Sequence, residues 1–271
     1  MSIVRPPAVA GLFYPAEARA LREAVRGLVR RVGHTGPVPK ALIVPHAAYE
    51  YSGPVAAAGF ARLAQDRQLI RRVVLLGPSH FAKVSGLALS SAEAFATPLG
   101  ELPVDRAAVK TLAAHPYVQV ADDAHSREHS LEVQLPFVQE LLEEVRVVPL
   151  AVGEARADVV GRVLEAVWGG PETRIVVSSD LSHYHAYADA RRLDRATARA
   201  VERLAPEGIP DDRACGARAI NGLLWSARTR RLRATTVDLR NSGDTAGTRD
   251  AVVGYGAFAF FAHQASSPSR S

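Results

Sequence analysis

Short apolar runs without a single polar side chain recur along the chain, each followed by a turn-forming or polar segment. They are rich in Val, Ile and Leu, a composition typical of strands buried on both faces of a parallel or mixed sheet. The purest runs are residues 41–44, 73–76 and 175–177. Less pure runs predict further strands at residues 86–90, 117–121, 146–152, 235–239 and 251–262.

Segments with apolar residues every three or four positions lie between these runs. In residues 16–32, Leu21, Val25 and Leu28 share one helix face, and Gly33 follows as a stop signal. Helices are likewise predicted at residues 53–64, 104–114, 130–145, 155–168, 188–204 and 214–227. Because strands and helices alternate, we expect a single α/β domain over residues 1–264 with a frayed tail at 265–271. Its central sheet should be mostly parallel or mixed and flanked by helices.

The bulk composition excludes several classes of protein. The single cysteine allows no internal disulfide and favours a cytoplasmic setting. No apolar stretch approaches the length of a membrane span, and the N-terminus lacks the apolar core of a signal peptide. The net charge of +5 comes from arginines dispersed among Asp and Glu, so we expect no nucleic-acid partner. Neither standard glycine-rich nucleotide motif is present.

Histidines follow three of the predicted strands and give the strongest functional signal. His46, His80 and His183 each come shortly after an apolar run. In a parallel sheet the carboxyl ends of the strands line the ligand crevice, so these imidazoles could converge. Imidazole is both a common metal ligand and a proton carrier near neutral pH. One such histidine alone is more often structural, but the recurrence of the pattern favours a site.

Two His–carboxylate pairs add candidate proton-transfer groups. His129 and Glu132 are three residues apart and would share a helix face, where they could hold a proton or simply complete a helix start. Asp180 precedes His183 by three residues and could orient its imidazole, or could only form a turn after the strand. We interpret these four residues as candidate catalytic groups.

A third metal ligand is less clearly indicated. Asp244 lies in the turn-rich loop 241–247, and with His46 and His80 it would complete a two-histidine, one-carboxylate set suited to Fe(II). A tight turn explains Asp244 equally well. Cys215 could be a reactive thiolate at a helix start or a small buried thiol. Ser79 or Ser179 could serve a Ser-His-Asp hydrolase, but no G-x-S-x-G motif supports that chemistry.

Several blocks in order make the chain resemble the Memo family, whose bacterial and archaeal members are called AmmeMemoRadiSam system protein B. The resemblance runs over nearly the whole chain and rests on residues 5–15, 45–47, 51–53, 77–80, 128–132, 178–183, 242–244 and 254–255. The family in turn resembles LigB-type class III extradiol dioxygenases, which use non-haem iron. By motif, His46 and His80 match metal ligands, and His183 and His129 match pocket residues.

The resemblance implies Fe(II) as the cofactor, with zinc or copper as alternatives. In the animal Memo protein the third ligand is a cysteine, which the resemblance places before the last strand, where this chain offers Asp244. The family name implies a radical SAM protein and an AMMECR1-like protein as partners, besides an unknown small-molecule substrate. Three functions stay open: an iron-dependent oxidoreductase, a non-catalytic accessory protein, and a hydrolase using metal-bound water.

Overall fold

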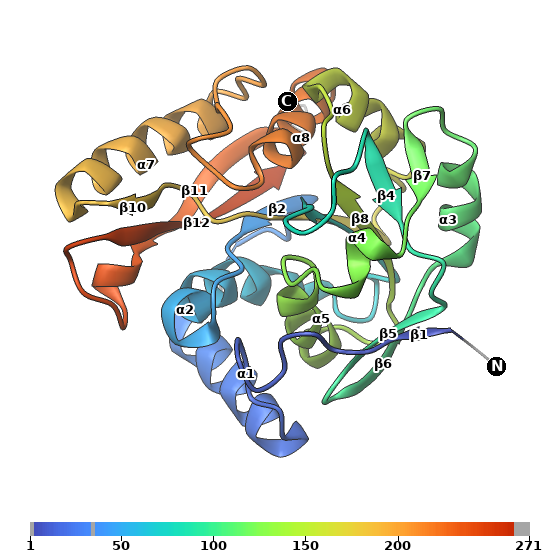
Figure 1. Cartoon of the computed structure of the whole chain (residues 1–271), viewed down its shortest axis with the longest axis horizontal. Helices are drawn as coiled ribbons and strands as arrows, with labels where there is room; N and C mark the ends of the chain where they lie inside the picture. Colours follow the sequence, from blue (N-terminus) through green and yellow to red (C-terminus); the bar gives the residue numbers. More distant parts are fainter. Residues whose placement is uncertain (1–2, 34–35, 263–271) are drawn as a thin grey trace, which may run out of the picture.

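A nine-stranded mixed sheet runs through the centre of the computed structural model, which describes residues 3–33 and 36–262 (Figure 1). Its strands lie in the order β10, β12, β2, β9, β3, β8, β4, β7, and β11 also pairs with β12. The bounds are β2 Ala41–Val44, β3 Arg72–Pro78, β4 Leu87–Leu89, β7 Val118–Val120, β8 Arg146–Val152, β9 Thr173–Ser178, β10 His183–His185, β11 Arg233–Asn241 and β12 Val252–Phe261.

The four middle strands, β2, β9, β3 and β8, are mutually parallel. The sheet continues through antiparallel pairings of β12 with β2 and of β4 with β8. Every residue of β2 and β9 is buried, as the pure apolar runs predicted. Because β2, β9 and β3 run in the same direction, the segments that follow them meet at one edge of the sheet.

Helices cover both faces of the sheet. In Figure 1, α1, α2 and α5 lie below the central strands, whereas α6, α7 and α8 lie above them. The rings of Phe60 and Phe137 stack at 5.0 Å and join the lower helices, and Gly222 lets α8 approach Val160 of α6 closely. The bounds are α1 Ala18–Val32, α2 Tyr49–Phe60, α3 Arg106–Ala113, α4 Asp123–Ser126, α5 Leu135–Leu141, α6 Ala157–Ala166, α7 Tyr187–Glu202 and α8 Ala217–Thr229, with short 3₁₀ helices η1 Ala61–Asp66, η2 Glu132–Gln134 and η3 Ser242–Asp244.

This layering confirms the predicted α/β fold, with two local differences. The helix predicted at residues 130–145 is wrong in extent, because α5 begins only at Leu135 with Pro136 in its first turn and ends at Leu141, and η2 precedes it. A small sheet of β1 (Val4–Arg5), β5 (Ala94–Thr97) and β6 (Gly100–Pro103) has no clear signal in the sequence. The predicted tail at 265–271 lies outside the described residues. None of the described helices is long and apolar enough to cross a membrane.

Candidate metal centre

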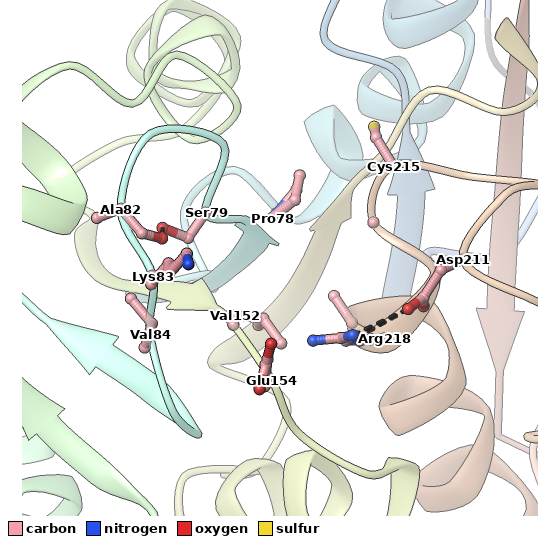
Figure 2. Close-up of a pocket in the computed structure, with 13 residues that line it drawn as sticks. Pro78, Ser79, Ala82, Lys83, Val84, Val152, Glu154, Asp211, Cys215 and Arg218 are labelled. Atoms are coloured by element: carbon pink, nitrogen blue, oxygen red, sulfur yellow. Dashed lines mark hydrogen bonds and ion pairs between the residues drawn. The ribbon is translucent and has the colours of Figure 1, made fainter.

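Two cavities open at this edge of the sheet, the larger where β2, β3 and β9 end and the smaller where β3 and β8 end. The larger, of about 510 Å³, contains His46, His80, His129 and His183 in its wall. The smaller, of about 290 Å³, lies on the other side of Cys215 and has a charged wall that includes Lys83, Glu154 and the Arg218–Asp211 ion pair (Figure 2). The edge of the sheet predicted to carry the site therefore does carry a hollow with converging imidazoles.

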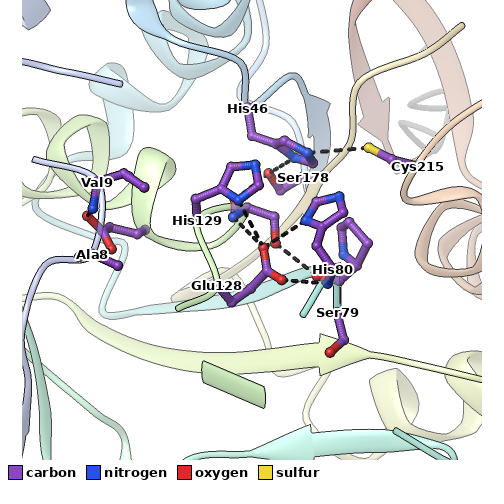
Figure 3. A network of polar contacts seen from close by, with 12 residues as sticks. Ala8, Val9, His46, Ser79, His80, Glu128, His129, Ser178 and Cys215 are labelled. Carbon is purple, nitrogen blue, oxygen red and sulfur yellow. Dashed lines mark hydrogen bonds and ion pairs between the residues drawn. The ribbon is translucent and has the colours of Figure 1, made fainter. Parts of the chain in front are cut away.

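His46, His80 and Cys215 bring their ligand atoms together at this edge. One nitrogen from each histidine and the cysteine sulfur lie within 4.8 Å of one another. The sulfur is 3.3 Å from Nε2 of His46, and the rings of His46 and His80 cross at 77° with centroids 5.4 Å apart (Figure 3). Two imidazoles and a sulfur in such an arrangement form a donor set for a first-row transition metal.

The hydrogen bonds of His46 fix which of its ring nitrogens faces the sulfur. Nδ1 lies 2.9 Å from Oγ of Ser178, and that hydroxyl donates its own proton to the Ser130 carbonyl oxygen at 2.6 Å. Ser178 also accepts a hydrogen bond from Nε2 of Gln134. Since the hydroxyl proton is already used, Nδ1 of His46 must donate, which leaves a lone pair on Nε2.

Glu128 orients His80 in the same way. Its carboxylate accepts from both Nδ1 and the backbone N–H of His80, at 2.9 and 2.6 Å. A carboxylate behind an imidazole is the usual partner of a metal-ligating histidine, because it fixes the ring and raises its basicity. Burial alone would raise the pKa of the Glu128 carboxyl, but the hydrogen bonds and charge of His80 lower it to about 2.

Cys215 reaches the site because the segment before α8 packs closely against the end of β9. The backbone N–H of Gly216 donates to Oγ of Ser179 at 2.9 Å. A Cβ atom at Gly216 would lie 2.7 Å from the Cβ of Ser179, so only glycine permits this approach. Burial and the nearby Asp180 carboxylate raise the pKa of the Cys215 thiol to about 12.

The structure does not bring Asp244 into this donor set. Its carboxylate accepts from the Tyr187 hydroxyl at 2.6 Å and from the backbone N–H of Asn241 at 3.1 Å, and the residue is exposed. Asn241 and Asp244 form a reciprocal capping box around η3. The loop thus uses the carboxylate for its own turn, and the residue that lies with His46 and His80 is Cys215 instead of Asp244.

His129 and His183 both line the larger cavity, as predicted, but Asp180 does not pair with His183. The His129 ring stacks on His80 at 4.8 Å, and burial lowers the pKa values of both His129 and His183. Asp180 instead accepts from the backbone N–H of His46 at 2.8 Å and holds the loop after β2. Burial raises the pKa of the Asp180 carboxyl to about 7.

Glu132 is a structural anchor, and its predicted catalytic role is not supported by its position. The side chain is fully buried and lies outside the larger cavity. It pairs with Arg5 and accepts hydrogen bonds from the Tyr14 hydroxyl and from the backbone N–H groups of Ala8 and Val9. The carboxylate therefore ties the N-terminal segment to the loop that carries His129.

Comparisons with known proteins identify the family and support the fold. The sequence model described as "Memo-like protein" matches residues 5–259. A MEMO1 family protein of Aquifex aeolicus is 35% identical over 263 residues, covering 93% of this chain and 97% of the relative. One from Aeropyrum pernix is 34% identical, covering 93% and 98%. The crystal structure of an uncharacterized protein from Escherichia coli K12 shares the fold with a TM-score of 0.51 at 15% identity, covering 79% of this chain and 98% of that one. The chain belongs to the Memo family.

Proposed function

We propose that this chain is a metal-dependent oxidoreductase that acts on a small organic molecule in the larger cavity. One redox-active first-row ion, Fe(II) in the first place, would be held by Nε2 of His46, Nε2 of His80 and the sulfur of Cys215. The observation that carries the proposal is the convergence of these three ligand atoms within 4.8 Å. Two protein nitrogens and one sulfur leave coordination positions for substrate on the side of the cavity.

The residues around the ligands fit such an ion. Both imidazoles have their far nitrogen engaged, by Ser178 and by Glu128, so each presents a lone pair to the centre. The Cys215 thiol holds its proton tightly when no cation is near, and a bound ion would supply the positive charge that favours the thiolate.

The ion would supply electron transfer and polarisation of a bound oxygen atom, and the chain would supply the surroundings. His129 and His183 line the cavity and offer proton donors or acceptors to a substrate. Asp180 holds the loop that carries His46 through the backbone N–H of that residue. The aromatic side chains of Phe13, Tyr51 and Tyr255 form part of the cavity wall and reduce the space for water.

A zinc-dependent hydrolase is the second candidate, and the sulfur donor is the specific observation that favours it. Replacing a carboxylate by a thiolate softens the donor set and shifts its preference toward zinc or Cu(I). The sulfur of Cys215, 3.3 Å from His46 Nε2, makes this alternative chemically reasonable. Partnership with a radical SAM protein and an AMMECR1-like protein stays a proposal, as does a purely accessory role.

Purification without oxygen, followed by metal analysis and oxygen-uptake assays, tests the proposal. We expect about one iron per chain, lost in His46→Ala and kept in His115→Ala, because His115 lies outside the larger cavity and is not one of the converging ligand residues. His183→Gln should keep the metal and lose turnover by about 10²–10⁴-fold if His183 moves a proton. Zinc content with oxygen-independent hydrolysis would overturn the oxidoreductase in favour of the second candidate.

A further inference from the structure

Tyr184 stands out among the residues of the larger cavity because its ring is unusually open to solvent. Its exposed fraction is 77%, although it lines the same cavity as His46 and His80. The nearest aromatic ring is that of His183, whose centroid lies 5.9 Å away at 63°. An aromatic side chain left this exposed beside the converging ligand residues gains little from packing in the free protein.

The backbone of Tyr184 is held in a conformation that tyrosine disfavours. Its φ angle is +59°, in the left-handed region usually occupied by glycine or asparagine. The pairing of β10 with β12 explains the angle, because His183 lies opposite Val253 and His185 lies opposite Val252. Tyr184 is thus the extra residue of a β-bulge, a device that redirects a side chain and is common beside active sites.

Strain and exposure at one residue beside a binding cavity indicate that the ring has a use outside the folding of the chain. Three more aromatic residues, Phe13, Tyr51 and Tyr255, line the same cavity. Aromatic faces favour flat ligands, since offset stacking adds to the burial of apolar surface. The histidines in that wall instead suit a polar head group of the ligand.

We propose that Tyr184 determines which molecules the cavity accepts, by stacking its ring on the planar, unsaturated body of a small molecule whose polar head group binds at the metal ligands. This role deepens the proposed function and rests on it. Tyr184 is then a substrate-contacting specificity residue, and the bulge is the feature that presents its ring.

Two hydroxamates test this role by differing only in the body of the ligand. Benzohydroxamate has a planar ring, and cyclohexanecarbohydroxamate has the same metal-binding head on a puckered ring. Their dissociation constants would be measured on protein loaded with zinc, which has no redox chemistry of its own. The preference is the dissociation constant of cyclohexanecarbohydroxamate divided by that of benzohydroxamate. We expect this ratio to be about three- to tenfold larger in the parent than in Tyr184→Leu. Tyr184→Phe should retain the preference, and so should the control Tyr117→Ala, whose exposed ring lies outside the cavity.

Thermal unfolding of the metal-free variants separates a binding role from a structural one. Tyr184→Gly should melt about 2–4 °C above Tyr184→Ala, because glycine relieves the left-handed strain, and it should still lose the planar preference. Suppose that Tyr184→Leu keeps the preference for benzohydroxamate while His46→Ala still loses hydroxamate binding. This result would overturn the role of Tyr184 and leave the proposed metal site standing. Failure of the zinc-loaded parent to bind either hydroxamate would overturn both this inference and the proposed metal site.

Discussion

The sulfur of Cys215 lies 3.3 Å from Nε2 of His46, although 169 residues separate them in the sequence. The contact joins the loop after β2 to the segment before α8 across the end of β9. It brings Cys215 close to both His46 and His80, whereas the carboxylate of Asp244 bonds to Tyr187 and to the backbone of Asn241.

Replacing Cys215 should weaken metal binding far more than replacing Asp244. We expect Cys215→Ser to lower affinity for zinc by more than about 100-fold, since even residues behind the ligands contribute about 10–100-fold. Asp244→Ala should leave affinity within about twofold of the parent, because its carboxylate bonds only to Tyr187 and to its own turn. Competition titration with a chromogenic chelator measures both, and equal losses in the two variants would contradict the assignment.

Glu128→Gln should weaken metal binding through His80 without unfolding the protein. Glutamine keeps the size of the side chain but carries no charge behind Nδ1 of His80. The carboxylate uses one oxygen for Nδ1 and the other for the backbone N–H of His80, whereas the amide has a single acceptor oxygen. The expected loss in affinity is about 10–100-fold. Isothermal calorimetry compares the variant with the parent, and unaltered affinity would show that Glu128 does not act on the donor set.

Glu132→Gln should reduce stability and leave metal affinity unchanged. The carboxylate is fully buried against Arg5, and breaking such a pair on one side costs about 3–5 kcal/mol. Urea unfolding should therefore show a lower midpoint. Metal binding by the folded fraction should match that of the parent, because Glu132 lies outside the cavity. A catalytic role would instead lower turnover at unchanged stability.

The thiol of Cys215 should be unreactive in the metal-free folded protein. Burial raises its pKa from 9.0 to about 12, so the folded state keeps a proton that the unfolded chain releases near pH 9. The contribution of the protonated thiol to the free energy of unfolding is therefore fully present below pH 9 and is lost as the pH rises from 9 through 12. At pH 8, iodoacetamide should label the folded protein at least about tenfold more slowly than the urea-unfolded protein. Cys215 is the single cysteine, so all labelling reports on it, and equal rates would contradict the raised pKa.

The sequence predicted the sheet and two of the three converging ligand residues, because both depend on local patterns. Pure apolar runs specify buried strands, and His46 and His80 each lie two residues after the end of such a strand. Cys215 has no such pattern, since its position depends on the long-range contact between Gly216 and Ser179. The one local indication of this close approach is Gly216, the glycine that follows the cysteine. The sequence could not show where the Asp244 carboxylate lies, because a carboxylate in a turn can bond to its own backbone as readily as to a metal.

The prediction for Glu132 interpreted its spacing from His129 on a regular helix. The chain there forms a 3₁₀ turn before Pro136, and the carboxylate turns toward Arg5. The sequence did not indicate the bulge at Tyr184, because a bulge depends on the register between β10 and β12.

X-ray absorption spectroscopy of the zinc-loaded protein tests the central claim most directly. If His46, His80 and Cys215 hold the ion, the spectrum should contain one sulfur at about 2.3 Å and two imidazole nitrogens at about 2.0–2.1 Å. The sulfur contribution should disappear in Cys215→Ser and persist in Asp244→Ala. A first shell made only of nitrogen and oxygen in the parent protein would contradict the account.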